Sequence, residues 1–250
     1  MTVPVLTISP DFSNDHVAGW YMFNTWLQKR LGQRVHLELY PDFPSQREAI
    51  ARGEVDLIYC NPYDAAALVR EHGFTAVAAP LAKPDEVVVA VGAEHAAQRV
   101  EDLAPGTRIA VTADPDVNLI GMIMLEPADL SAANTRTINA SSYVLVAKKL
   151  LRGEADAGFF LKDAFHDLSP MVARQLRPLV TSEISVIRHV FLAGPRLPDL
   201  RAALLDALLA MNAPGTRDHA VLDGLGLRGW EAIHDEDTEF MIDLMDTLKD

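Results

Sequence analysis

The feature that most constrains the fold is a five-residue near-repeat. Arg52-Gly53-Glu54-Val55-Asp56 recurs one hundred residues later as Arg152-Gly153-Glu154-Ala155-Asp156. A Gly-Glu-x-Asp turn alone could recur by chance, but each copy follows a helical pattern and precedes an apolar run typical of a strand. Because the order of elements also matches, we interpret the pair as an internal duplication, which predicts two similar lobes.

Short apolar runs alternate with helical patterns along most of the chain. This alternation predicts an α/β protein, with mixed, mostly parallel sheets flanked by helices. We expect a lobe 1 of residues 1–83 and 184–250, a lobe 2 of residues 84–183, and a cleft between the lobes. Two long elements are predicted in the second half, a helix over 162–175 and a returning strand over 184–192. Ligands of such sheets bind outside the carboxyl ends of the strands and at helix N-termini.

Composition excludes several classes of function. The 250 residues are 49% hydrophobic, which suffices for two lobes, and the net charge of −13 disfavours nucleic acid and acidic membranes as partners. No apolar run reaches the roughly 18 residues of a membrane span, so we expect no direct membrane insertion. Residues 1–10 lack the pattern of a signal peptide. We therefore expect a periplasmic protein if a signal was removed, and a cytoplasmic one if this chain is the full native protein.

Motifs for cofactors and catalysis do not fit the predicted elements. The run 224–229 matches G-x-G-x-x-G, but it follows a helix rather than a strand, so the geometry that holds a dinucleotide is missing. The chain has no P-loop, no G-x-S-x-G and no H-E-x-x-H, and its eight histidines lack metal-ligand spacing. We expect no cofactor, no metal and no catalytic residue.

Several short segments, taken in order, form a pattern that is moderately specific for one family. They are residues 29–35, 40–43, 52–59, 114–115, 152–156, 201–209 and 221–226. On these segments the chain resembles the phosphonate/phosphite family of ABC-transporter solute-binding proteins, which have the type 2 periplasmic-binding fold. The resemblance covers nearly the whole chain and implies hinge closure on a small oxyanion and delivery to an ABC permease.

The resemblance also implies that the ligand pocket is altered. The family holds phosphonate with a Ser-Thr-Ser-Gly run at a helix N-terminus, and the matching stretch 116–121 lacks the hydroxyls and begins with Asp116, which would repel a phosphonate. A family histidine falls near Ser142 or Tyr143 and is absent. Of two acidic positions that hold an amino group, one matches Asp163 and the other Arg188. We therefore expect a polar or anionic ligand and no specificity for phosphonate.

The candidate ligand contacts follow predicted strands or begin predicted helices. Cys60 could be a soft metal ligand, although a small buried filler is the favoured interpretation. Phe43 could contact ligand or pack the lobes, and Ser141 could be a helix N-cap or an anion ligand. Arg188 could bind an oxyanion or form an interlobe salt bridge to Asp85 or Asp163. The full set is Asp11, Ser13, Phe43, Cys60, Asn61, Tyr63, Asp116, Asn118, Ser141, Ser142, Tyr143, Asp163, Arg188 and His189.

Three functions compete at this point. The first is a small-solute-binding protein that serves an ABC permease or presents its ligand to a sensor protein. The second is a cytoplasmic enzyme on the same fold, acting on a small carboxylate substrate with Asp163 as general base. The third is a ligand-sensing protein that passes closure to a partner.

Overall fold

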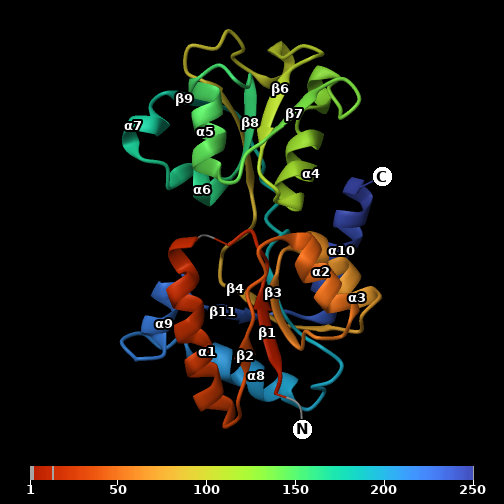
Figure 1. Ribbon diagram of the computed structural model, residues 1–250, viewed down its shortest axis with the longest axis vertical. Helices are drawn as coiled ribbons and strands as arrows, with labels where there is room; N and C mark the ends of the chain where they lie inside the picture. Colours follow the sequence, from red (N-terminus) through yellow and green to blue (C-terminus); the bar gives the residue numbers. More distant parts are fainter. Residues whose placement is uncertain (1–2, 13, 250) are drawn as a thin grey trace. The chain divides into compact units, whose positions relative to one another are not determined.

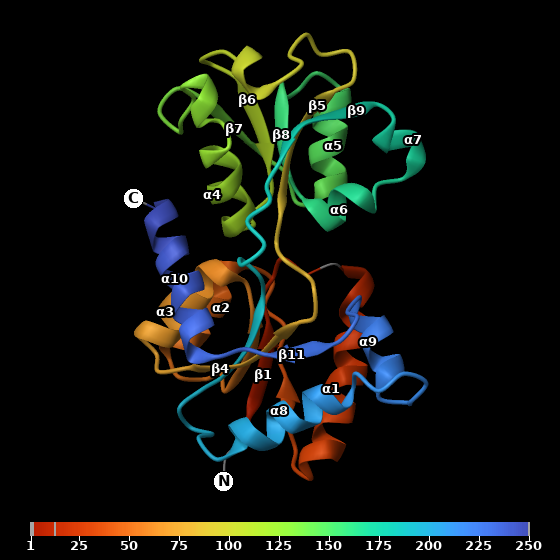
Figure 2. The same ribbon diagram turned by 180° about the vertical axis from the view of Figure 1, so that it is seen from behind.

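The computed structural model describes residues 3–12 and 14–249, which form two compact units (Figures 1 and 2). The first unit comprises Met1–Lys83 and Arg188–Asp246, and the second comprises Pro84–Ile187 and Thr247–Asp250. Each unit has its own sheet, flanked by its own helices. Within the described ranges, no helix combines the length and the apolar character that a bilayer crossing requires.

The sheet of the first unit has the strand order β11-β4-β10-β3-β1-β2. β1 runs parallel to β2 and β3, whereas β10 pairs antiparallel with β3 and β4, and β11 antiparallel with β4. The strands are β1 Val5–Ile8, β2 His36–Leu37, β3 Leu57–Cys60, β4 Thr75–Pro80, β10 Val190–Ala193 and β11 Trp230–Ala232. The helices are η1 Asn14–His16, α1 Val17–Leu31, α2 Phe43–Ala51, α3 Pro62–Arg70, α8 Leu200–Ala210, α9 His219–Leu225 and α10 Asp235–Lys249.

The sheet of the second unit has the order β7-β6-β8-β5-β9 and is also mixed, because β6 is parallel to β7 and β8 while β5 is antiparallel to β8 and β9. Its strands are β5 Val87–Gly92, β6 Arg108–Val111, β7 Arg136–Asn139, β8 Ala157–Leu161 and β9 Leu176–Thr181. Its helices are η2 Val100–Asp102, α4 Pro115–Ile123, η3 Glu126–Ala128, α5 Tyr143–Leu151, α6 Lys162–His166 and α7 Pro170–Ala173.

Apolar side chains bury both faces of each sheet. In the first unit, Trp20 and Phe23 of α1 pack with Trp230 in one cluster, while Ile50 and Leu68 bring α2 and α3 into a cluster on the other face. In the second unit, Val146 of α5 packs with Phe160 of β8 on one face. α4 covers the opposite face, where Gly121 lies against the ring of Phe159. Because apolar side chains fill these layers, polar side chains lie at the ends of the strands and in the first turns of the helices that follow them.

Two predicted elements are shorter in the structure than in the sequence pattern. The helix expected over 162–175 is two short helices, α6 and α7, and the second begins at Pro170, whose ring disfavours continuation of a preceding helix. The strand expected over 184–192 begins only at Val190, because Ser185 has a φ of 64° and the amides of Ile184 and Ser185 donate to Glu86 rather than to a strand. β4, β9 and β11 were not predicted.

The two copies of the near-repeat build the same local structure. Gly53 and Gly153 each end a helix with a positive φ, 69° and 66°, a conformation that favours glycine. The Asp56 carboxylate then accepts a hydrogen bond from the Val5 amide at 2.9 Å, and the Asp156 carboxylate accepts one from the Arg108 amide at 2.8 Å. Each aspartate therefore fixes the start of the neighbouring parallel strand.

The glycine-rich run 224–229 has a packing role. A Cβ added to Gly19 would lie 1.8 Å from the carbonyl oxygen of Gly224, so α1 and α9 cross with backbone against backbone. Gly226 ends α9 in the left-handed conformation, with a φ of 65°. The run thus packs and ends α9, consistent with the exclusion of a dinucleotide site.

Candidate functional site

The first unit gathers polar side chains where β1 and β3 end and β10 begins, and we call this group the first polar edge. Asn61 follows β3 and caps α3 by accepting a hydrogen bond from the Asp64 amide at 2.8 Å. Its own amide nitrogen donates to Asp64 at 3.2 Å and to Asp11 at 3.3 Å. His189 Nε2 lies 3.3 Å from the other oxygen of Asp11. The buried amide of Asn61, after β3, thus reaches Asp11 after β1, and through Asp11 it reaches His189 before β10, while its second carboxylate partner, Asp64, lies on α3.

Arg47 of α2 extends this network to the surface. Its Nε donates to Asp64 at 2.7 Å, and its side chain is 45% exposed. The guanidinium carbon lies 5.3 Å from the centre of the Phe43 ring and 5.6 Å from that of Tyr63, within cation–π range of both. Phe43 is one turn before Arg47 on α2, and Tyr63 is in the first turn of α3.

Arg188 and His189 are adjacent in the sequence but contact different neighbours. The His189 ring stacks on Tyr59, with centroids 5.0 Å apart and planes at 25°, and its side chain is only 13% exposed. Arg188 instead pairs with Glu231 of β11, within the same unit. Both residues therefore belong to the first unit, and the ion pair of Arg188 with Glu231 lies within that unit.

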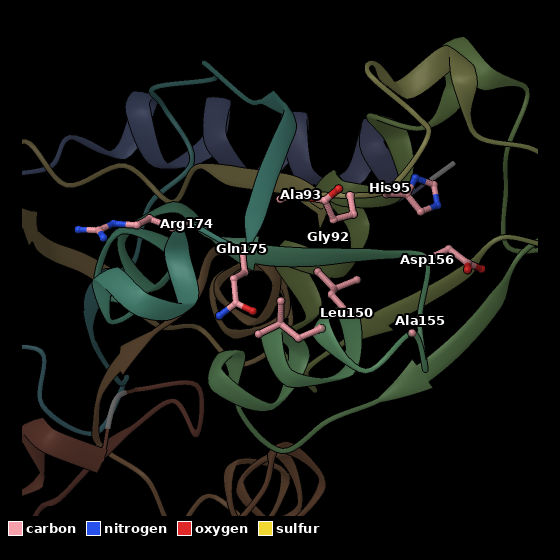
Figure 3. Close-up of a pocket in the computed structure, with 11 residues that line it drawn as sticks. Gly92, Ala93, His95, Leu150, Ala155, Asp156, Arg174 and Gln175 are labelled. Atoms are coloured by element: carbon pink, nitrogen blue, oxygen red, sulfur yellow. The ribbon is translucent and has the colours of Figure 1, made fainter.

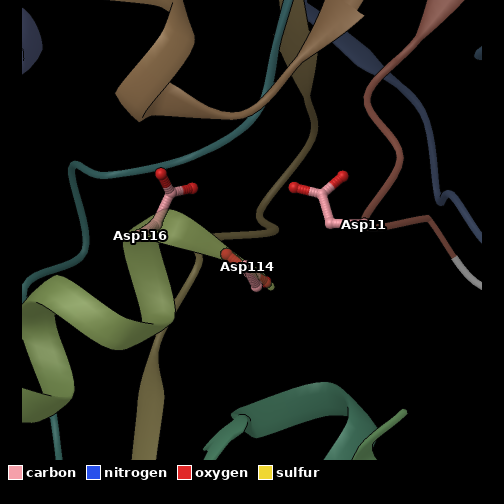
Figure 4. A group of neighbouring side chains, drawn as sticks. All are labelled: Asp11, Asp114 and Asp116. Atoms are coloured by element: carbon pink, nitrogen blue, oxygen red, sulfur yellow. The ribbon is translucent and has the colours of Figure 1, made fainter. Parts of the chain in front are cut away.

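The second unit carries a second polar edge at the start of α4, after β6. Asp114 is the N-cap of α4: one of its carboxylate oxygens accepts from the Val117 amide at 3.3 Å, and the other accepts from the Tyr143 hydroxyl at 2.7 Å. Asp116 follows in the first turn with 2% exposure (Figure 4). Pro115 between them has no N–H. The first turn of α4 therefore presents carboxylates where a free helix start would present donors to an anion.

The remaining predicted contacts have structural settings of their own. The cap of α5 is Ser142, which accepts from the Leu145 amide at 3.3 Å, and not Ser141, because the helix begins one residue later than expected. Asn118 donates to the Thr112 carbonyl at 2.9 Å. Asp163 is exposed in the first turn of α6. Cys60 is buried in the apolar core, a setting that fits a small filler. Ser13 lies outside the described residues.

A separate pocket of about 490 Å³ lies in the second unit beyond the end of β5 (Figure 3). It includes Leu150 and Gln175, with His95 and Asp156 at its rim. The adjoining loop is held by Arg177, which donates to the carbonyls of Ala93, His95 and Ala97. The pocket lies at the ends of β5 and β8 remote from the segment that leads into α6, so it is distinct from the second polar edge.

Three residues of these edges were missed by reasoning on the sequence. Arg47 and Asp64 pair across two helices, and nothing in their spacing of 17 residues signals that contact. Asp114 entered the sequence analysis only within segment 114–115 of the family resemblance, without a role of its own. Its position directly before Pro115 and three residues before Val117 was a usable signal, because Asp as N-cap with Pro at N1 is a favoured helix start.

The two sheets, each flanked by helices, define the fold class of the chain as a two-unit α/β protein. The chain belongs to the family described as "ABC transporter, phosphonate, periplasmic substrate-binding protein", whose model matches residues 6–238. The family consists of substrate-binding proteins rather than enzymes, and it implies a small-molecule ligand and an ABC permease partner. The comparison with curated proteins found no sequence match.

Solved structures share the fold at low sequence identity. PhnD1 from Prochlorococcus marinus in complex with methylphosphonate has a TM-score of 0.83 and 13% identity, covering 99% of this chain and 98% of that one. XAC2383 from Xanthomonas citri bound to ATP has a TM-score of 0.81 and 14% identity, covering 100% and 98%. The aliphatic sulphonate binding protein SsuA from Escherichia coli has a TM-score of 0.69 and 15% identity, covering 100% and 92%.

Proposed function

We propose that this protein captures a small polar or anionic solute, other than a phosphonate, for delivery to an ABC permease outside the cytoplasmic membrane. Membership of the phosphonate-type binding-protein family supports the transport role and the periplasmic location. The methylphosphonate, ATP and sulphonate named for the structural neighbours are anions of different size and shape. The fold is therefore compatible with a range of anionic ligands, and the side chains at the polar edges decide among them.

The start of α4 is the observation that argues against phosphonate. A dianion at a helix start needs free backbone donors and a favourable dipole. Here Pro115 supplies no donor, the Val117 amide donates to Asp114, and Asp114 and Asp116 add negative charge. Repulsion by two carboxylates would exceed the benefit of the helix dipole, which is equivalent to only about half a charge.

The first polar edge supports a role in holding the solute. Asp11, Asn61 and His189 are fixed by one another, so their geometry is set before a ligand arrives. We propose that each polar edge contributes ligand contacts, namely Asp11, Asn61, Tyr63 and His189 in the first unit and Asp116, Ser142 and Tyr143 in the second. Phe43 supports Arg47 in this arrangement.

A thermal-shift screen followed by calorimetry tests the proposal. The panel would contain carboxylates, amino acids, sulphonates, nucleotides and methylphosphonate. We expect a solute other than methylphosphonate to raise the melting temperature and to bind with one site per chain, and mass spectrometry to recover it unchanged. Micromolar binding of methylphosphonate would refute the exclusion of phosphonates, and chemical conversion of the bound solute would refute the binding role.

A further inference from the structure

The first polar edge contains one cation whose setting is unlike that of a simple surface ion pair. From its geometry we infer that Arg47 recognises a carboxylate group of the solute. The inference rests on the proposed function and deepens it by naming the chemical group that the first unit binds. Arg47 was not among the contacts expected from the sequence.

The guanidinium of Arg47 is fixed in place by three neighbours. Asp64, only 9% exposed, accepts from Nε at 2.7 Å and is itself tied to Asn61. The rings of Phe43 and Tyr63 lie within 5.3 Å and 5.6 Å of the guanidinium carbon. An arginine normally loses considerable rotamer freedom when it binds a ligand, and these contacts have already removed much of that freedom.

The fixed guanidinium still has donors to offer. Asp64 takes the Nε hydrogen, and within the described residues the two terminal amino groups of Arg47 donate no hydrogen bond. These two groups form the end of the guanidinium fork, which matches the two oxygens of a carboxylate. The 45% exposure of the side chain leaves the fork accessible to a solute.

Local charge favours a single negative charge on the ligand. Asp64 and Asp11 already place two carboxylates in the network that Arg47 joins. With Arg47 these charges sum to −1, so each further negative charge on a ligand is disfavoured, and a phosphonate, which carries more charge than a carboxylate, binds less well. The delocalised, weakly hydrated guanidinium between aromatic rings also suits a planar partner.

Arg52, one turn further along, provides a matched comparison. Its Nε donates to Glu54 at 2.8 Å and its Nη2 donates to the other oxygen of Glu54 at 2.9 Å. The side chain is 56% exposed, and Glu54 already occupies one side of its fork. Arg52 is therefore an arginine of similar exposure with its best carboxylate position already filled.

Nuclear magnetic resonance on the full chain tests the inference. Protein labelled with 15N in its arginine side chains would be titrated with acetate and, separately, with methylphosphonate at constant ionic strength and pH 7. We expect acetate to shift the Arg47 resonances saturably, with at least a several-fold lower dissociation constant than methylphosphonate. We expect Arg47→Lys, followed through the backbone amide resonances of the same helix in uniformly 15N-labelled protein, to raise the acetate dissociation constant roughly tenfold, because the paired donors are lost. Arg52→Lys should leave it unchanged.

Two results would overturn the inference. One is an acetate response at Arg47 that is no larger than that at Arg52, and the other is tighter binding of methylphosphonate than of acetate at Arg47. The wild-type titration decides both, so the test survives even if Arg47→Lys does not fold. Because acetate reports on Arg47 alone, its failure leaves the solute-binding role standing. Conversion of a solute would refute that role without changing the acetate result.

Discussion

The two Arg-Gly-Glu-x-Asp turns can be compared residue by residue, because each begins the central strand pairing of its own unit. Both glycines have a positive φ, and both aspartates accept a hydrogen bond from the first amide of the neighbouring parallel strand. Their surroundings differ. The Asp56 side chain is 5% exposed and pairs with Arg196, whereas that of Asp156 is 30% exposed and pairs with Arg108.

The difference comes from the segment that returns to the first unit. Arg196 follows β10, and the Gly194 amide after that strand donates to the Asp56 carbonyl at 2.7 Å, so the later chain covers the first turn. In the second unit the partner of Asp156 is Arg108, the residue whose amide it already binds. The aspartate of this turn is therefore buried in the first unit and partly exposed in the second.

The largest expected effect concerns helix packing, for which one closely packed helix glycine from each unit can be compared. A Cβ on Gly19 would meet the Gly224 carbonyl oxygen at 1.8 Å, and a Cβ on Gly121 would meet the Phe159 ring at 2.6 Å. We expect Gly19→Ala to cost about 3 kcal/mol or more of unfolding free energy, because backbone must move, and Gly121→Ala about 1–2 kcal/mol, because a side chain can adjust.

Urea unfolding of both variants measures this difference. Gly32→Ala is a useful control, because nothing lies within 4 Å of its added Cβ and only its positive φ resists the change. A Gly19→Ala protein as stable as Gly121→Ala would contradict the close crossing of α1 and α9.

The second prediction compares the two aspartates directly. We expect Asp56→Ala to cost about 2–3 kcal/mol, because it removes a buried carboxylate and leaves the half-buried Val5 amide and one side of Arg196 without an acceptor. We expect Asp156→Ala to cost about 1 kcal/mol, because its ion pair is partly exposed and water replaces part of what is lost. Equal losses in urea unfolding would show that the returning segment adds nothing to the first turn.

The third prediction is a pH dependence that arises in the second unit. Glu86 is buried, but hydrogen bonds from Ser182, Ile184 and Ser185 outweigh burial and lower the pKa of its carboxyl below 4.5. The folded pKa is thus below the unfolded one, so the stabilisation is complete above about pH 4.5 and is lost as pH falls through the folded pKa.

Glu86→Gln tests that cause. A glutamine offers only one acceptor oxygen and turns its NH2 group toward donors. We therefore expect Glu86→Gln to lower the unfolding free energy by about 1–2 kcal/mol at pH 7, and to reduce the further loss of stability as the pH falls. Asp156, whose pKa is lowered chiefly by its hydrogen bond from Arg108, adds a second acid-sensitive contribution. Arg108→Gln measures the contribution of Asp156 separately. If Glu86→Gln left the loss of stability at low pH unchanged, Glu86 would not be its cause.

Reasoning on the sequence predicted the fold better than it predicted the contacts at its edges. The alternation of patterns and the repeated turn predicted two mixed sheets flanked by helices, because period and turn chemistry are local properties. The expectation that the sheets are mostly parallel was wrong, because β5 and β10 each pair antiparallel with both of their neighbours. β4, the alanine-rich strand over Thr75–Pro80, was missed because its small side chains give no alternation. The long strand expected over 184–192 was wrong because Glu86, about one hundred residues earlier, captures the amides of Ile184 and Ser185.

The polar edges show the same limit. Asn61 was a sound candidate because a strand followed by Asn-Pro predicts a helix cap facing the strand ends. Its links to Asp11 and Asp64, and that of Asp64 to Arg47, depend on pairing across β1, β3 and α2. Such long-range contacts leave no periodic signal in one sequence, so the residue that carries the further inference was visible only in the structure.

The smallest expected change in stability tests the contrast between the two polar edges. Asp114→Asn keeps an acceptor oxygen for the Val117 amide, and its NH2 group can donate to the Tyr143 hydroxyl, which accepts as readily as it donates. Because Asn caps helices as well as Asp does, we expect a change in stability of about 0.5 kcal/mol or less. The negative charge at the start of α4 is lost, however, and methylphosphonate affinity should rise roughly three- to tenfold.

Asp129→Asn is the matched control, because it makes the same change in net charge elsewhere in the same unit. Asp129 is exposed, and its φ of 55° is one that asparagine tolerates. Calorimetry with methylphosphonate compares the two variants. An equal rise in methylphosphonate affinity in both variants would mean that the net charge of the protein, rather than the carboxylate of Asp114, excludes the phosphonate. The difference between the first polar edge, which contains Arg47, and the acidic second polar edge would then not explain the choice of ligand.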